Sequence, residues 1–290
     1  MIRAVFLTLL AVLLLAACAR EGPQSDGGPA LWEVSGPKDM PAGWLFGTVH
    51  ALPREVVWRT PRLDQALDAA QVLVVEVGNV GDERAIADAF RRIAIDQASP
   101  PLLDRIDPRA RPRLVAMLDR EGVPAQRFDD LETWAAALAL ARLAGSGESA
   151  QGVDRALIAA FADRPVIELE GAAAQLAIFD RLPEREQRDL LAAVVHEGER
   201  ADARGTELAD AWASGDVARL EQLALRGMLE DPELRQALLI SRNRAWAERI
   251  ARLIARGEQP FVAVGAAHLL GANGIPALLT DQGYTLRRIQ

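Results

Sequence analysis

The feature that most constrains the fold of this chain is the near-continuous run of branched apolar residues from Val72 to Val77. Such a run is typical of a β-strand that is buried on both faces, as in a parallel sheet covered by helices. Only Glu76 places a charged side chain in the run. A fold that contains this strand therefore needs further strands beside it, helices on both faces, and a partner for one buried carboxylate.

Further strands and helices follow from the periodicity of the apolar residues. Besides 72–77, short apolar or alternating runs predict strands at residues 30–35, 43–49, 165–170, 260–265 and 284–289. The first two of these should form an antiparallel hairpin with a long loop, and the last should lie at an edge of the sheet. Apolar residues that recur three and four apart predict helices at residues 62–70, 82–97, 109–120, 131–143 and 153–162.

The stretch from residue 182 to 256 shows no strand pattern and predicts a helical subdomain, inserted between two strands of the sheet. Strands alternate with helices on either side of this insertion, which is the pattern of a parallel sheet with helical cover. We therefore expect an α/β domain over residues 30–290, with a largely parallel central sheet and the helical insertion at about 182–256.

The N-terminus predicts export and a lipid anchor. A short positive start is followed by an apolar run and by Leu15-Ala16-Ala17-Cys18, which resembles the lipobox of bacterial lipoproteins. The resemblance implies removal of residues 1–17 and attachment of lipid to Cys18, and the alternative is an ordinary signal peptide. Residues 18–29 have the composition of a flexible tether. Ala19 favours the outer membrane, because some lipoproteins retained in the inner membrane carry aspartate there.

Composition excludes several classes of protein. The formal net charge is −8 at pH 7 and no basic cluster is present, so we expect no nucleic-acid partner. Cys18 is the only cysteine, so the folded part can contain neither a disulfide nor a thiolate metal site. The chain shows no Gly-x-Ser-x-Gly motif, no His-Glu-x-x-His motif and no phosphate-binding glycine loop.

Two of the three histidines share one local pattern. Gly47-Thr48-Val49-His50 and Gly265-Ala266-Ala267-His268 each follow an apolar strand. A glycine late in a strand permits a bend or a close backbone approach. The histidines then emerge at the carboxyl ends of strands, where ligands bind in open α/β sheets. His196 lies within a predicted helix and is interpreted as a structural or surface residue.

Acidic residues near the strand ends are further candidates. Glu76 should be paired or bound to a metal ion, because an isolated buried carboxylate is costly. Strand alternation places Glu168 and Glu170 on the same face, with Ile167 and Leu169 on the other. For Glu168 and Glu170, simple solvation at a strand end is the alternative to a role in a site.

The last helix of the 182–256 block places two polar residues on its buried face. Arg242 and Asn243 fall on the apolar stripe of this helix, whereas Arg244 points away from it. A buried arginine requires acidic partners, and Glu76 and Glu170 are the candidates. A purely structural salt bridge between the helix and the sheet is the alternative to a catalytic role.

These residue types suit hydrolysis. Two histidines and a carboxylate can bind a divalent transition metal and leave a position open for water. The metal would generate a nucleophile, Arg242 would stabilise the developing oxyanion, and a second carboxylate would manage protons. A histidine paired with a glutamate could also activate water without metal, and spacing alone does not separate these two mechanisms.

Several motifs together give a family resemblance. After residue 32 the chain resembles the TraB/GumN family, which includes the animal Tiki proteases. The matching motifs are Gly47-Thr48-Val49-His50, Val75-Glu76, Gly152-Val153-Asp154, Leu169-Glu170 with Gln175, Trp212-Ala213-Ser214-Gly215-Asp216, Arg242-Asn243-Arg244-Ala245-Trp246 and Val264-Gly265-Ala266-Ala267-His268-Leu269-Leu270-Gly271. The chain departs from the family at Gly171, where the usual threonine hydroxyl is missing. The resemblance implies a metal-dependent, protease-like hydrolase, as best established for the Tiki branch.

The sequence thus predicts a metal-dependent hydrolase that acts on a peptide or similar small substrate. The predicted metal ligands are His50, Glu76 and His268, and the ion is expected to be manganese, cobalt or zinc. The predicted catalytic residues are Glu76, Glu170, Arg242 and Asn243. The alternatives are an envelope protein that binds a metal, haem or a peptide without turnover, a metal-free esterase, and an envelope scaffold.

Overall fold

A computed structural model describes residues 27–36, 40–49, 52, 55–78, 82–144, 152–198 and 200–290. His50 and Cys18 lie outside these residues, as do the signal segment and most of the predicted tether. None of the helices in the described ranges is both long and apolar enough to cross a membrane.

The described strands form one six-stranded sheet in the order β4-β3-β5-β2-β1-β6. Their bounds are β1 Leu31–Ser35, β2 Pro41–Thr48, β3 Val72–Val75, β4 Val166–Glu168, β5 Pro260–Gly265 and β6 Thr285–Arg288. The neighbours β4, β3, β5 and β2 are parallel, whereas β1 is antiparallel to both β2 and β6. The predicted hairpin, the fully buried strand β3 and the edge strand β6 are confirmed.

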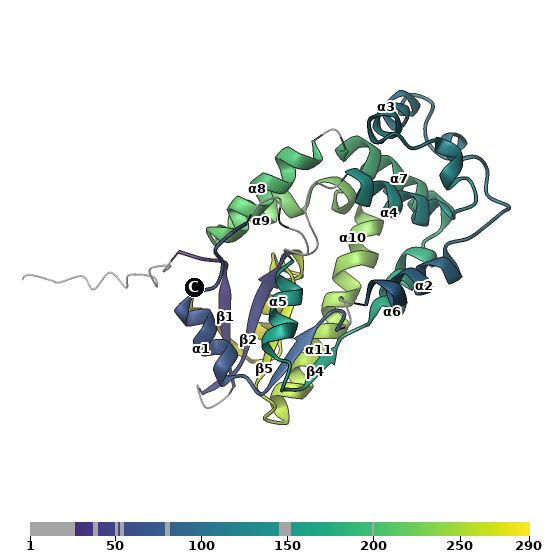
Figure 1. Ribbon diagram of the computed structural model, residues 1–290. Helices are drawn as coiled ribbons and strands as arrows, with labels where there is room; N and C mark the ends of the chain where they lie inside the picture. The colour runs from purple at the N-terminus through teal and green to yellow at the C-terminus, as the bar shows by residue number, and fades with distance from the viewer. Residues whose placement is uncertain are drawn as a thin grey trace, which may run out of the picture.

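Helices surround this sheet (Figure 1). Their bounds are α1 Pro61–Ala69, α2 Glu83–Ile93, α3 Arg111–Glu121, α4 Thr133–Ala144, α5 Val153–Ala160, α6 Ala172–Asp180, α7 Glu184–Glu197, α8 Ala201–Ala213, α9 Val217–Ala224, α10 Pro232–Arg235, α11 Ser241–Ala255 and α12 Ile275–Asp281. Short 3-10 turns include η1 Leu102–Asp104, η2 Ala125–Phe128, η4 Gly227–Leu229 and η6 Ala266–Leu269, and η5 Gln236–Ile240 is a π-helical turn. The expected α/β fold with a mostly parallel sheet is confirmed.

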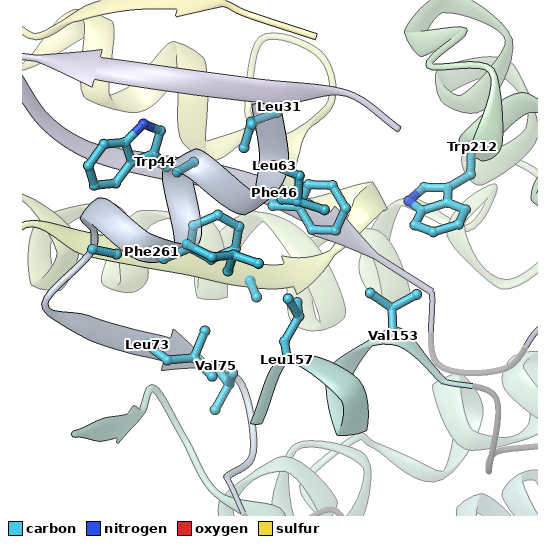
Figure 2. Packing of buried hydrophobic residues seen from close by; sticks show 14 of the residues in the cluster. Leu31, Trp44, Phe46, Leu63, Leu73, Val75, Val153, Leu157, Trp212 and Phe261 are labelled. Atoms are coloured by element: carbon cyan, nitrogen blue, oxygen red, sulfur yellow. The ribbon is translucent and has the colours of Figure 1, made fainter. Parts of the chain in front are cut away.

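The two faces of the sheet are covered by different helices. Helices α1, α5, α8 and α9 bury one face, and Figure 2 shows Phe46 and Phe261 of the sheet packed near Leu157 and Trp212 of these helices. On the opposite face, Trp246 and neighbouring residues of α11 pack with α12 against β1, β2, β3 and β5. The sheet is therefore the middle of three layers, as its apolar strands require.

A third hydrophobic cluster lies in a helical lobe that contains no described strand. Most of its buried residues come from α3, α4, α7 and α10, with Trp134 fully buried among them. This lobe combines helices before and after β4 in the chain, while α11, within the predicted insertion, packs on the sheet. The division of the chain into a tether, a domain and an insertion with fixed boundaries stays a prediction.

The consecutive elements α10, η5 and α11 form one helical path that connects the lobe to the sheet. It begins at Asp231, whose side chain accepts a hydrogen bond from the backbone N–H of Leu234, and Pro232 takes the first helical position. The π-helical turn η5 interrupts this path directly before Arg242. Extra-wide turns of this kind change the direction of side chains and occur often at functional sites.

Candidate functional site

The candidate site lies where the carboxyl ends of parallel strands meet the first turn of α11. Glu76 follows β3, Gly265 ends β5, and His268 lies in the 3-10 turn η6 directly after β5. Arg242 and Asn243 enter from α11. The topology therefore brings together residues that are widely separated along the chain, at the edge of the sheet where ligands bind in such folds.

Glu76 is buried and accepts several hydrogen bonds. Its side chain is 6% exposed. Oε1 accepts from the backbone N–H of Gly265 at 2.8 Å, and Oε2 accepts from Nε2 of Gln175 at 3.1 Å and from Nη2 of Arg242 at 2.9 Å. Charge-assisted bonds of this kind stabilise a carboxylate away from water. The expectation that Glu76 cannot lie unpaired in its strand is confirmed.

Arg242 is held between two carboxylates. Nη2 contacts Glu76, while Nε lies 2.9 Å from Oε1 of Glu170 and Nη2 lies 3.0 Å from Oε2 of Glu170. Nη1 donates to the carbonyl oxygen of Leu238 in η5 at 2.8 Å, and the guanidinium lies 4.5 Å from the ring of Trp246. The prediction that Glu76 and Glu170 are the partners of a buried Arg242 is confirmed.

His268 has a defined orientation. Its Nδ1 lies 2.5 Å from Oδ1 of Asn243, whose Nδ2 donates to the carbonyl oxygen of Asn273 at 2.7 Å. Because the amide oxygen of Asn243 can only accept, Nδ1 carries the proton, and in neutral His268 Nε2 holds a lone pair. Nε2 lies 3.3 Å from Nη1 of Arg242 and 3.7 Å from Oε1 of Glu76.

Of three further candidates, only Asn243 has a partner that the sequence did not suggest. Asn243 contacts His268 and a backbone carbonyl, not an acid. Oε1 of Glu168 accepts from the backbone N–H of Gly78 at 2.7 Å, away from Arg242, although Ile167 and Leu169 do share the opposite face. His196 is exposed on α7, as expected for a surface residue. His50 and Cys18 lie outside the described residues.

The end of β2 is supported by residues that the sequence analysis gave little weight. Thr48 donates to Oδ1 of the buried Asp154 at 2.8 Å, and Nε1 of Trp212 donates to the carbonyl oxygen of Gly47 at 2.7 Å. A Cβ on Gly47 would lie 3.0 Å from the Cα of Ala266, so the glycine permits close approach of β2 to η6. The sequence analysis named Asp154 and Trp212 only as members of family motifs. No pattern in the sequence predicted a role for the side chain of Thr48.

A cavity of about 740 Å³ opens from these residues between the sheet and the helical lobe. Thr48, Glu76, Gln175, Arg242 and His268 form its polar end at the carboxyl ends of the strands. Helices α4, α6, α7, α8 and α9 contribute most of the remaining wall. Its volume is within the range of pockets that enclose small molecules.

Comparisons with known proteins agree with the motifs. The sequence profile of the TraB/PrgY/gumN family matches residues 30–288. The protein named "Uncharacterized protein YbaP" of Escherichia coli (strain K12) is 26% identical over 240 residues, which cover 81% of this chain and 86% of the relative. The protein of the same name from Shigella flexneri gives the same values. No solved structure matches. The family match spans nearly the whole described fold, and the chain belongs to the TraB/PrgY/gumN family.

Proposed function

We propose that this protein is a metal-dependent hydrolase of the cell envelope that cleaves a peptide bond or a related acyl bond. The observation that carries the proposal is the geometry of His268. Its Nδ1 is fixed by Asn243, and its Nε2 lies 3.3 Å from Nη1 of Arg242 and 3.7 Å from Oε1 of Glu76 at the polar end of a cavity. A buried imidazole held in one tautomer beside a carboxylate is suited to bind a metal or to accept a proton.

The donor set fits a divalent transition metal. Nε2 of His268 and Oε1 of Glu76 lie 3.7 Å apart, so both can reach one ion at bond lengths of about 2.1 Å. An imidazole that binds a metal usually donates its other N–H to an oxygen, as Nδ1 does here. The predicted third ligand, His50, lies outside the described residues, which alone hold no group of three or more metal-binding side chains. Manganese, cobalt and zinc suit these ligands.

A bound divalent ion would supply Lewis acidity beside the scissile carbonyl. Arg242 would donate to the oxygen atom on which negative charge develops, and its two carboxylate partners keep its guanidinium in place before substrate arrives. Gln175 and the backbone of Gly265 orient Glu76. Glu170, 15% exposed, accepts hydrogen bonds from Arg242 and holds it in position.

We further propose that the protein acts outside the cytoplasm, on the periplasmic side of a membrane, where lipid on Cys18 anchors it. The support is the apolar N-terminal run that ends at Leu15-Ala16-Ala17-Cys18. The outer membrane is favoured over the inner membrane by Ala19.

Metal content tests the proposed function directly. Mass spectrometry of the chain from Ala19 onward should give about one equivalent of a transition metal, as expected for a single site. His50→Ala and His268→Ala should both lose the ion, whereas His196→Ala, at an exposed histidine of α7, should keep it. No bound metal after reloading with manganese, cobalt and zinc would contradict the proposal.

One observation favours a metal-free hydrolase as the second candidate. The guanidinium of Arg242 approaches Nε2 of His268 to 3.3 Å, and a nearby cation opposes metal binding. In that case His268 would take a proton from the attacking water while Asn243 holds the ring. Turnover that survives a chelator would select this candidate. Saturable binding of a ligand without product would select a non-enzymatic binder.

A further inference from the structure

We infer that the cavity binds a hydrocarbon chain, and that the substrate is an aliphatic acyl ester or amide with its carbonyl group at Arg242 and His268. The inference rests on the proposed function and names its substrate class. Hydrolysis would form a bond from water oxygen to the acyl carbon, break the acyl C–O or C–N bond, and pass a water proton to the departing oxygen or nitrogen.

The lining of the cavity is apolar over most of its length. Of 31 described residues that line it, 8 are polar or charged, and the others are glycine, alanine or larger apolar residues. The polar residues form two groups. One is the polar end at the strands, and the other is the ion pair of Glu197 and Arg204 together with Arg226. The wall between these groups offers no charged side chain among the described residues.

The backbone of the wall favours a hydrocarbon over a peptide. Most of the lining residues lie within helices, where their N–H and C=O groups already bond to each other. A peptide in the cavity would therefore bury amide groups that find few partners, and each unpaired group opposes binding. A methylene chain has no such groups, and it gains from every apolar contact.

The far end of the cavity limits the length of the chain. Arg204 pairs with Glu197 and also donates to the carbonyl oxygens of Leu223 at 2.9 Å and Arg226 at 2.8 Å. This bonded cluster separates the apolar cavity from a second, polar cavity of about 420 Å³ that also contains His196. We expect affinity to rise with chain length and to stop rising once the chain reaches Arg204.

Methyl ketones test the inference without any need for turnover, because they carry a carbonyl group but no bond that water can cleave. Isothermal titration calorimetry of the chain from Ala19 onward with methyl hexyl, methyl octyl and methyl decyl ketone should show affinity rising about fourfold per methylene group, equal to about 0.8 kcal/mol. The apolar tripeptide N-acetyl-Leu-Leu-Leu-amide should bind more weakly than methyl octyl ketone. Equal affinities along the ketone series, or tighter binding of the tripeptide, would overturn the inference.

Two variants test whether the ketones bind in this cavity. Ala224→Leu on α9 and Ala141→Leu on α4 each add volume to the wall, and each should weaken binding of the longest ketone about tenfold. Ala218→Leu, at an exposed position of α9, should bind as the parent does. Normal ketone binding in both cavity variants, with melting temperatures unchanged, would place the ketones elsewhere. Length-dependent ketone binding without hydrolysis of acyl esters or amides would keep the inference of a hydrocarbon site and would overturn both the proposed function and the assigned substrate.

Discussion

At the scale of single residues, Arg242 is the cation that balances the two carboxylates of Glu76 and Glu170. One guanidinium faces two carboxylates whose side chains are 6% and 15% exposed. Removing such charges from water is costly, and the cost is recovered only where hydrogen bonds satisfy each group. Arg242 meets this condition through both carboxylates and the Leu238 carbonyl.

Arg242→Met should therefore destabilise the fold strongly. The change leaves two carboxylates without their cation, and breaking buried pairs of this kind costs about 3–5 kcal/mol. Urea unfolding followed by circular dichroism measures the loss. Arg244→Met, an exposed change on the same helix, should stay within about 0.5 kcal/mol of the parent. Equal stability of the two variants would mean that the cluster contributes nothing to the fold.

Asn243→Leu tests the support of His268. The substitution removes the acceptor for Nδ1 and the donor to the Asn273 carbonyl, so the free energy of unfolding should fall by about 2 kcal/mol or more. The metal content at limiting metal should fall as well, because the imidazole is no longer oriented. Thermal unfolding and metal analysis of the same sample give both values. Full metal retention would show that Asn243 does not position His268.

The contacts of a side chain could be predicted where the buried face of one helix determined its direction. The apolar stripe of α11 fixed the direction of Arg242, and burial of a charge then required acids. The partner of Asn243 could not be predicted in this way. It depends on how η6 folds back from β5 toward Asn273, and an amide can pair with many groups. Thr48 was missed because a threonine in a strand is common and only the fold brings Asp154 beside it.

At the scale of elements, strands were predicted well and some helices were not. Runs such as 260–265 are apolar without interruption, which a buried parallel strand requires. The helix α6 was missed because Ala172–Asp180 is apolar on nearly every side and shows no stripe. The helix α12, Ile275–Asp281, was missed because it spans barely two turns. Neither helix could be recognised from a pattern that depends on one apolar face.

The start of α4 gives a prediction about pH. Glu132 precedes Thr133 and accepts from Nε1 of Trp134 at 2.9 Å. Burial raises the pKa of Glu132 above its ordinary value of 4.5, and the bond from Trp134 partly opposes this. The folded state therefore holds the proton at pH values where the unfolded chain releases it. The contribution of this group to stability is full below about pH 4.5 and is lost as pH rises through the higher folded pKa.

Glu132→Gln should thus flatten the dependence of stability on pH in the weakly acidic range. The glutamine keeps an oxygen acceptor for Trp134 but carries no charge. Urea midpoints measured from about pH 4 to 7, the span in which raised carboxyl groups titrate, test this. The same substitution at the exposed Glu121 of α3 is the control. If the urea midpoints of the parent and of Glu132→Gln change with pH in parallel, the pH dependence does not come from Glu132.

At the scale of the whole molecule, the class of fold followed from the sequence but the arrangement did not. Alternating strands and helices predict a parallel sheet, yet no pattern in the chain gives the order β4-β3-β5-β2-β1-β6. The position of the lobe over the strand ends could not be predicted either, because it depends on packing between helices that are distant in the chain. The cavity between the lobe and the sheet is therefore a property of the assembled fold alone.

The predicted anchor can be tested on the full chain in bacterial cells. Growth with radioactive palmitate should label the protein, and Cys18→Ala should abolish the label, because the chain has no other cysteine. The variant should also leave the membrane fraction on centrifugation, because the lipid on Cys18 is the proposed means of attachment. A Cys18→Ala protein that still sediments with membranes would require another means of attachment.

The central place of β5 determines the order of events during folding. β5 pairs with both β3 and β2, yet Pro260–Gly265 follows the strands β1 to β4 and most of the helices in the chain. Contacts between such distant segments form slowly, because long loops must close first. A nascent chain that has not yet released this segment exposes the edges of β2 and β3, which can pair with other chains. These edges therefore stay open to wrong pairing until β5 emerges.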